Sequence, residues 1–193
     1  MTILKHLDQN SLAVQYLMKK DKHLAKVIQM VGPMNYRLQT DAYAFLVSQI
    51  IEQMLSKKVA QILTLRLTNE CNGHICPTKI DYLSDEQLLN IGISHSKVHY
   101  IQNLTNAILT NKINFSDYLQ MSDTEIIDSL TTVKGIGIWS AKMFLIFSLN
   151  RPDILPFEDV AFLQSYSWVY KTHNLKKAAV VKKCSKWHPY ASI

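Results

Sequence analysis

The sequence predicts an all-α fold, formed either as one compact unit or as two helical lobes that flank a cleft. Apolar residues recur at helical spacing along almost all of the 193 residues, and no segment alternates convincingly with a period of two. Only 5 glycines and 5 prolines are present, which argues against a loop-rich or all-β protein. We expect a single unit over 1–193, whose possible lobes are about 41–150 and about 1–40 together with 151–193.

The first half of the chain contains four predicted helices, most of them with a sequence signal at one end. Asp21 is a candidate cap for the second helix, which Gly32-Pro33 ends, and Ser56 can cap the fourth. The third helix is apolar on nearly every side, which predicts a central and mostly buried position. The four predicted ranges are 11–19, 22–31, 41–55 and 57–69, and a loop follows at 71–77.

The second half contains six predicted helices, two of which begin with a capping box. In a capping box, a serine side chain and a Glu or Gln side chain three residues later bond to each other's backbone N–H groups. Ser84 with Gln87 and Ser122 with Glu125 fit this pattern. The predicted helices are a short one from Ser84 that ends before Gly92, then 94–111, 122–132, 138–149, 157–170 and 175–187.

Positive charge is concentrated at the end of the chain. The net charge is +6, from 21 basic and 15 acidic residues. Six lysines and no acidic residue follow Asp159, so residues 1–159 are neutral, with 15 basic and 15 acidic groups. A region of one charge sign is typical of proteins that bind a polyanion such as DNA, although it also describes a lysine-rich helix that faces solvent.

The segment 133–141 joins two predicted helices through a turn that contains two glycines. Gly135 and Gly137 flank the apolar Ile136, which we expect to fill the space between the helices. The N–H groups that begin the second helix can donate to a phosphate, whose charge the helix dipole favours. With Lys134 beside them, these residues predict a helix-hairpin-helix clamp on the DNA backbone. A lone Gly-x-Gly also fits an ordinary interhelical turn.

Several motifs together resemble those of the helix-hairpin-helix DNA glycosylase superfamily, in particular its AlkA-type branch (DNA-3-methyladenine glycosylase II). The hairpin reads Gly-Ile-Gly-Ile-Trp-Ser-Ala at 135–141, and Leu-Pro-Phe-Glu-Asp follows at 155–159. The segments 48–60, 92–101 and 186–192 resemble three further motifs of the family, in the same order. The resemblance covers roughly residues 20–193, and several ordered motifs are much harder to obtain by chance than one.

The resemblance places the catalytic carboxylate at Asp159. Breaking an N-glycosidic bond builds positive charge on the sugar, which a nearby carboxylate stabilises while it orients the attacking water. An alkylated purine that is already cationic leaves without a general acid, so one carboxylate suffices. The other interpretation of Asp159 is a helix N-cap. Its neighbour Glu158 faces elsewhere on a helix and is the weaker candidate.

The resemblance also places a wedge, which fills the gap left by a flipped nucleotide, at Gln53-Met54-Leu55. Met54 is our choice, because a flexible thioether suits an irregular gap, but Met54 fits the core stripe of its own helix equally well. Trp139 occupies the position of the nucleophilic lysine of bifunctional relatives, and Lys142 is out of register with that pattern. We therefore predict a monofunctional hydrolase, in which Trp139 either stacks on the damaged base or belongs to the core.

No cofactor or metal is expected. Some relatives carry an iron–sulfur cluster on four cysteines after the catalytic aspartate, whereas only Cys184 follows Asp159 here. Cys71, His74 and Cys76 form a metal-like trio without an apparent fourth ligand, so we expect unliganded cysteines in a loop. No apolar run approaches the ~18 residues that span a bilayer, and the first ten residues do not form a signal peptide.

The sequence therefore predicts a base excision repair glycosylase that acts as a monomer on double-stranded DNA in the bacterial cytosol, at the nucleoid. The resemblance, together with the absence of an obvious general acid, makes N3-methyladenine and N7-methylguanine the expected substrates, with deaminated purines and etheno adducts as alternatives. One alternative is a non-catalytic module that binds damaged DNA. The family continues with a final helix beyond the position of Ile193, which argues for this alternative, whereas Asp159 and the Gln53 region argue against it. The other is an unrelated helical domain for protein interaction, which would show no salt-sensitive DNA binding.

Overall fold

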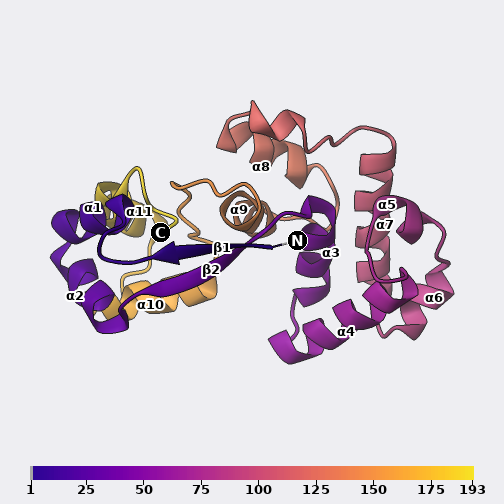
Figure 1. Ribbon diagram of the computed structural model, residues 1–193, viewed down its shortest axis with the longest axis horizontal. Helices are drawn as coiled ribbons and strands as arrows, with labels where there is room; N and C mark the ends of the chain where they lie inside the picture. The colour runs from indigo at the N-terminus through magenta and orange to yellow at the C-terminus, as the bar shows by residue number, and fades with distance from the viewer. Residues whose placement is uncertain (1) are drawn as a thin grey trace. The chain divides into compact units, whose positions relative to one another are not determined.

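The computed structural model describes residues 2–193 and confirms the all-α class (Figure 1). The described residues also form a two-stranded sheet, of β1 (Thr2–Leu7) and β2 (Met34–Gln39), and the 3-10 helices η1 (Asp117–Leu119) and η2 (Ser185–Trp187). Their α-helices are α1 (Leu12–Lys20), α2 (Lys22–Val31), α3 (Ala42–Glu52), α4 (Lys57–Glu70), α5 (Pro77–Asp81), α6 (Asp85–Asn90), α7 (His95–Leu109), α8 (Asp123–Thr131), α9 (Ile138–Phe147), α10 (Val160–Tyr170) and α11 (Lys177–Cys184). Within this part of the chain, no helix is long and apolar enough to cross a bilayer.

Local capping interactions fix where several of these helices begin. Both predicted capping boxes are present, with Ser84 and Gln87 at the start of α6 and Ser122 and Glu125 at the start of α8. The predicted cap Asp21 accepts hydrogen bonds from two backbone N–H groups in the first turn of α2. Each of these interactions joins residues that are close in sequence, which is why the sequence predicted them.

The antiparallel pair of β1 and β2 is absent from the sequence prediction. Its register runs from Thr2 opposite Gln39 to Leu7 opposite Met34. Only Leu38 of β2 is buried, so the sheet has no continuous apolar face and leaves no period-two signal in the sequence. The short helix α5 was also missed, because its 5 residues are too few to show helical periodicity.

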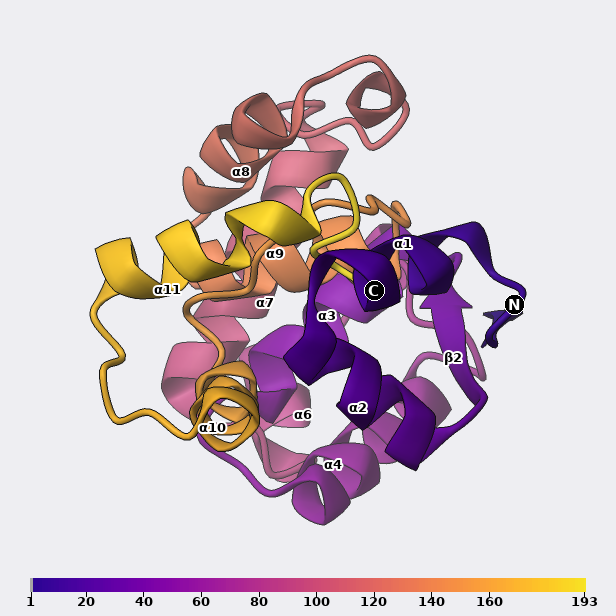
Figure 2. The ribbon, with the colours of Figure 1, turned by 90° about the vertical axis from the view of Figure 1, so that its left-hand side faces the viewer.

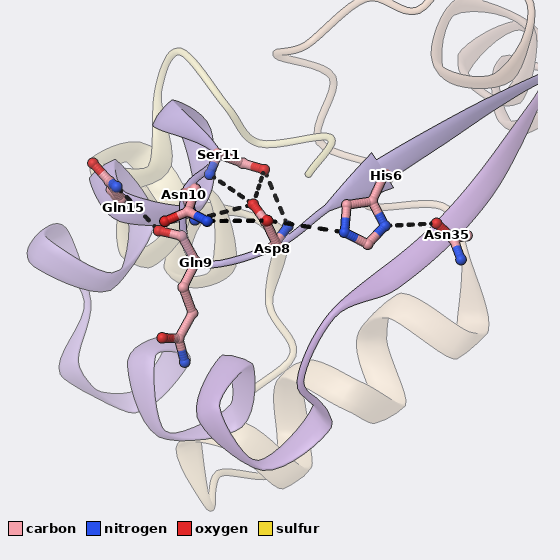
Figure 3. Close-up of polar contacts among 7 residues, drawn as sticks. All are labelled: His6, Asp8, Gln9, Asn10, Ser11, Gln15 and Asn35. Atoms are coloured by element: carbon pink, nitrogen blue, oxygen red, sulfur yellow. Dashed lines mark hydrogen bonds and ion pairs between the residues drawn. The ribbon is translucent and has the colours of Figure 1, made fainter.

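Asp8 fixes the turn that leads from β1 into α1 (Figure 3). Its carboxylate accepts a hydrogen bond from the Ser11 hydroxyl at 2.9 Å and from the backbone N–H groups of Asn10 and Ser11 at 3.0 Å. The Ser11 hydroxyl and these N–H groups hold the pKa of Asp8 below its ordinary value. Beside this turn, His6 and Asn35 are hydrogen bonded at 2.8 Å across the two strands.

Residues 41–144 form one compact unit. Its core contains α3, whose fully buried residues are Leu46, Val47, Ile50 and Ile51. Helices α4 and α7 pack against α3, and α5 and α6 pack against α7. The prediction of a central and mostly buried third helix is therefore confirmed.

The other compact unit combines the described residues up to Thr40 with residues 145–193. Within it α2 contacts α10 and α1 contacts η2, so helices from the first and last parts of the chain lie side by side (Figure 2). The predicted lobe boundary near residue 150 falls in the structure between Phe144 and Leu145, inside α9. The core of this unit is built on Leu17, Tyr166, Val180, Cys184 and Trp187.

Candidate functional site

The glycine turn joins α8 to α9 in the unit of residues 41–144. Gly135 has a φ angle of +109°, which residues with a side chain rarely adopt. A Cβ atom at this position would lie 2.4 Å from the Cβ atom of Tyr100, which belongs to α7. The turn therefore requires glycine at position 135 both for its backbone conformation and for the close approach of Tyr100.

The same turn presents backbone N–H groups at the start of α9. Ile136 is buried, whereas Lys134, Gly137 and Ile138 are exposed. The carbonyl of Gly137 accepts the N–H of Ala141 at 3.0 Å, so the hydrogen-bond pattern of α9 begins at Gly137. The first N–H groups of a helix have no acceptor inside the helix. At this exposed end they can donate to an anion such as a phosphate.

The turn Gln53-Met54-Leu55, called the 53–55 turn below, follows the end of α3. Helix α3 ends at Glu52, three residues before the predicted end, and the N–H of Leu55 donates to the Glu52 carbonyl. Met54 has a φ angle of +58°, and its side chain is fully exposed. The interpretation of Met54 as a core residue is therefore wrong, because the helix ends before it and its side chain faces solvent.

Lys97 of α7 binds the end of α3. Its Nζ atom donates to the carbonyl oxygens of Ile51 and Gln53, at 2.8 and 2.6 Å. The last carbonyls of a helix lack partners within the helix, so these bonds satisfy acceptors that α3 leaves open. Partial burial lowers the pKa of Lys97. The sequence showed Lys97 only as part of a family motif, in which its spacing of three from Tyr100 places both on one face of α7.

The 53–55 turn is also bonded to the glycine turn. The side-chain amide of Gln53 donates to the carbonyl of Gly135 at 2.9 Å. Asn103, about one turn of α7 beyond Tyr100, donates to the carbonyl of Lys134 at 3.3 Å. Sequence reasoning missed Asn103, because a polar residue on a helix carries no signal for a distant carbonyl. Helix α7 therefore holds both turns in a fixed relation.

A groove opens beside the 53–55 turn in the same unit. Its lining combines apolar side chains with the polar groups that hold the turn. These residues are Ile51, Gln53, Met54, Leu55, Val59, Leu63, Gly92, Ile93, Ser94, Ser96, Lys97 and Tyr100.

Asp159 lies at the N-terminus of α10, in the unit that contains both ends of the chain. Its half-buried carboxylate accepts the backbone N–H of Phe162 at 2.8 Å, and its own N–H donates to the Pro156 carbonyl at 2.9 Å. Asp159 is therefore an N-cap, and this bond fixes the orientation of its carboxylate. The neighbouring Glu158 lies 3.9 Å from the Nζ atom of Lys177.

Trp139 is the second residue of α9 and is half-buried. Its side chain is thus neither enclosed in the core nor fully open to solvent. Lys142, three residues further along the helix, is also half-buried. A stacking role of Trp139 toward a damaged base stays a prediction.

The three residues of the metal-like trio have different surroundings. Cys71 is buried, and Cys76 is the N-cap residue of α5. The Nε2 atom of His74 is 3.0 Å from a carboxylate oxygen of Asp41, the residue that caps α3. Among residues 2–193, no group of three His, Cys, Asp or Glu side chains could hold a metal ion.

Asp21 has a second role that the sequence did not predict. Besides capping α2, its buried carboxylate accepts hydrogen bonds from the Tyr170 hydroxyl and from the Trp187 indole N–H at 3.0 Å, and it pairs with Lys186 at 3.0 Å. Burial acts to raise the pKa of Asp21, but the bonds from Tyr170, Trp187 and Lys186 outweigh it and hold that pKa well below its ordinary value. Burial and the Asp21 carboxylate raise the pKa of Tyr170.

The six lysines that follow Asp159 in the sequence are mostly open to solvent. Five of the six are exposed, and only Lys186 is half-buried. Lys183 lies over the ring of Tyr170, with its Nζ atom 4.9 Å from the ring centroid. Exposure fits both a polyanion contact and a lysine-rich helix that faces solvent, so the polyanion contact of these lysines stays a prediction.

The chain is similar in sequence to known DNA repair proteins. The family model of the HhH-GPD superfamily base excision DNA repair protein matches residues 47–189. The DNA-3-methyladenine glycosylase 1 of Schizosaccharomyces pombe is 28% identical over 173 residues, which cover 86% of this chain and 75% of that protein.

Two solved structures extend the similarity to the three-dimensional fold. A DNA-3-methyladenine glycosidase from Bacillus halodurans superposes with a TM-score of 0.89 at 29% identity, over 98% of this chain and 88% of that chain. A 3-methyladenine DNA glycosylase from Schizosaccharomyces pombe, in complex with abasic DNA, superposes with a TM-score of 0.81 at 27% identity, over 93% and 91% of the two chains.

Proposed function

The chain belongs to the HhH-GPD superfamily of base excision DNA repair proteins and is a DNA glycosylase for damaged duplex DNA, and on this basis we propose that it hydrolyses the N-glycosidic bond of alkylated purines. Relatives of this chain are named as glycosylases of 3-methyladenine. We extend the substrate class to N7-methylguanine because both alkylated bases are cationic. We also propose that the chain belongs to the AlkA-type branch, on the motifs at 135–141 and 155–159.

In this proposal the glycine turn binds the DNA backbone. The exposed N–H groups at the start of α9 donate to a phosphate, and the nearby Lys134 adds positive charge. Contacts of this kind position a protein on DNA without reading its sequence. The close approach requires a small residue at Gly137, where the backbone is exposed.

The 53–55 turn supplies the wedge. A base inside a duplex is out of reach of the enzyme, so the nucleotide must be flipped out at a cost of a few kcal/mol. The fully exposed Met54 fills the space that the nucleotide leaves. Because Lys97 and Gln53 hold the backbone of this turn, the wedge enters the duplex at a fixed position relative to the glycine turn.

Asp159 carries the chemistry. Its carboxylate stabilises the positive charge that builds on the sugar and orients the water that attacks the sugar. The hydrogen bond from Phe162 holds the carboxylate in one orientation before the reaction begins. A cationic base leaves without protonation, so the step needs no second carboxylate.

We propose that the enzyme is monofunctional. Bifunctional relatives form a Schiff base through a lysine at the position of Trp139, and this chain has no lysine there. Trp139 instead stacks on the electron-poor base in this proposal. We further propose that the enzyme acts as a monomer, and that in the cell it works in the bacterial cytosol, at the nucleoid.

One observation carries the proposal, namely the hydrogen bond through which Gln53 joins the exposed Met54 turn to the glycine turn. A structural turn has no need of a fully exposed methionine fixed beside a phosphate-binding end. A protein that holds the DNA backbone and displaces a nucleotide beside it requires both features, a phosphate-binding turn and an exposed side chain fixed next to that turn.

The test is single-turnover release of 7-methylguanine from methylated duplex DNA, comparing wild type with Asp159→Asn. The matched control is Asp8→Asn, because Asp8 also accepts backbone N–H groups before a helix of the same unit. We expect release by wild type and the control, and a loss of about 10³-fold or more in Asp159→Asn. Salt-dependent DNA binding without release by wild type would support a non-catalytic module, and equal release by all three proteins would refute the role of Asp159.

A further inference from the structure

The chain's last residues bind the loop that leads to Asp159, within one compact unit. The backbone N–H of Ile154 donates to the Ser192 hydroxyl oxygen at 2.7 Å. The backbone N–H of Ser192 donates in turn to the carbonyl of Pro152 at 2.9 Å. The segment Trp187–Ser192, called the clasp below, is thus bonded to both sides of residue 153 in this loop.

Asp153, between these two positions, adds side-chain contacts to the same segment. One of its carboxylate oxygens accepts the backbone N–H of Ala191 at 3.1 Å, and the other is bonded to the Nδ1 atom of His188. The side chain of Asp153 is only 26% exposed, whereas that of His188 is 75% exposed. The mostly buried carboxylate is therefore bonded to the clasp through one backbone N–H group and through the exposed imidazole of His188.

The clasp is anchored at its other end by Trp187. Its indole N–H donates to Asp21, and its ring meets the ring of Phe162 edge to face, with centroids 6.3 Å apart. Phe162 is the residue whose backbone N–H bonds to the Asp159 carboxylate. Leu155 and Phe157 lie between Asp153 and Asp159 in the sequence and pack against the core that contains Trp187.

We propose that Asp153 is a positioning residue for the reaction, and that the clasp acts through the loop 152–159 to hold the Asp159 carboxylate at the sugar. This inference rests on the proposed function, because it concerns the geometry of the same carboxylate. The loop is held before Asp159 by Asp153 and Ser192, and after it by the contact of Phe162 with Trp187. A misplacement of about 1 Å in a reacting group can lower a rate by about 100-fold.

The experiment compares Asp153→Ala, Asp153→Asn and Ser192→Ala with wild type, and uses Asp8→Asn as a control outside the loop and the clasp. The single-turnover rate constant for release of 7-methylguanine is measured at saturating protein, together with the Kd for the same duplex. We expect Asp153→Ala to lower the rate constant by about 10- to 100-fold with little change in Kd. Asp153→Asn should recover part of the rate, because an amide oxygen still accepts the N–H of Ala191.

A double-mutant cycle separates positioning from general loss of structure. If Asp153 acts through Asp159, Asp153→Ala should cost little in the Asp159→Asn background. Effects that multiply in the double variant, or a wild-type rate in Asp153→Ala, would overturn the proposal.

Hydrogen exchange gives a readout that does not need turnover, so failure of the proposed function can be told apart from failure of this inference. Asp153→Ala should speed exchange at the Phe162 amide while residues 41–144 keep wild-type protection. Unchanged exchange at Phe162 would refute the clasp even if the wild-type protein proves inactive.

Discussion

The side-chain amide of Gln53 donates a hydrogen bond to the backbone carbonyl of Gly135 across a distance of 2.9 Å. The two residues are 82 positions apart in the sequence. Gln53 begins the exposed turn that carries Met54, and Gly135 belongs to the turn that begins α9. Because the acceptor is a backbone atom, the bond depends on the conformation that the glycine turn adopts.

Replacing Gln53 by alanine should therefore uncouple the two turns without unfolding the protein. The loss of one hydrogen bond should lower the free energy of unfolding by about 1 kcal/mol. The single-turnover rate of base release should fall much further, because the wedge loses its fixed position. Urea unfolding and base release measure the two effects. Gln61→Ala, at an exposed position of α4, should change neither, and a wild-type release rate in Gln53→Ala would refute the coupling.

The two glycines of the hairpin should respond differently to alanine. At Gly135 the positive φ angle and the clash with Tyr100 should together cost about 3 kcal/mol or more of the free energy of unfolding. A methyl group at position 137 would have no atom within 4 Å of it, so Gly137→Ala should stay within about 0.5 kcal/mol of wild type. Gly137→Ala should nevertheless weaken DNA binding, because the methyl group occupies the approach of the phosphate. Equal stability of the two variants in urea would contradict this account.

Met54→Ala should leave stability unchanged and reduce base release. A fully exposed side chain makes no core contact, so the free energy of unfolding should change by no more than about 0.5 kcal/mol. Release of 7-methylguanine should slow, because the alanine methyl group cannot fill the gap in the base stack. Met30→Ala supplies the control, since Met30 is also largely exposed, on α2. A similar loss of release in both variants would argue against a wedge at Met54.

The buried Asp21 should make the unit that contains it sensitive to acid. The pKa of Asp21 in the folded chain lies below its ordinary value of 3.8, so its contribution to stability is complete above that pH. The contribution is lost as the pH falls below 3.8 toward the lower folded pKa. Asp21→Asn should therefore be less stable than wild type at pH 7, by about 3 kcal/mol, because Lys186 loses its charged partner. On acidification the variant should lose less stability than wild type, because it has no carboxylate to protonate at this position.

Thermal unfolding from pH 7 down to pH 2 measures this dependence. Glu86→Gln is the appropriate comparison, because it removes an exposed carboxylate of α6. If wild type and Asp21→Asn lost stability in parallel below pH 4, the buried carboxylate would not be the source of the acid sensitivity.

The start of most helices could be read from the amino-acid sequence alone, because a cap is an interaction between neighbouring residues. Ser84 with Gln87 and Ser122 with Glu125 are each three residues apart, so their pattern predicts their structure. The apolar stripe of α3 likewise predicted a buried helix. The strands β1 and β2 escaped this reasoning because their exposed sheet has no apolar face to reveal its period.

How the candidate site residues are held depends instead on tertiary packing. Sequence motifs marked Gln53, Gly135 and Asp159, but could not show that Gln53 bonds to Gly135 or that Asp153 is held by the end of the chain. The side chains that bond to the Asp21 carboxylate lie 149 and more positions away from it. A hydrogen bond between distant residues depends on where packing places two backbones, and residue spacing along the chain carries no record of that placement.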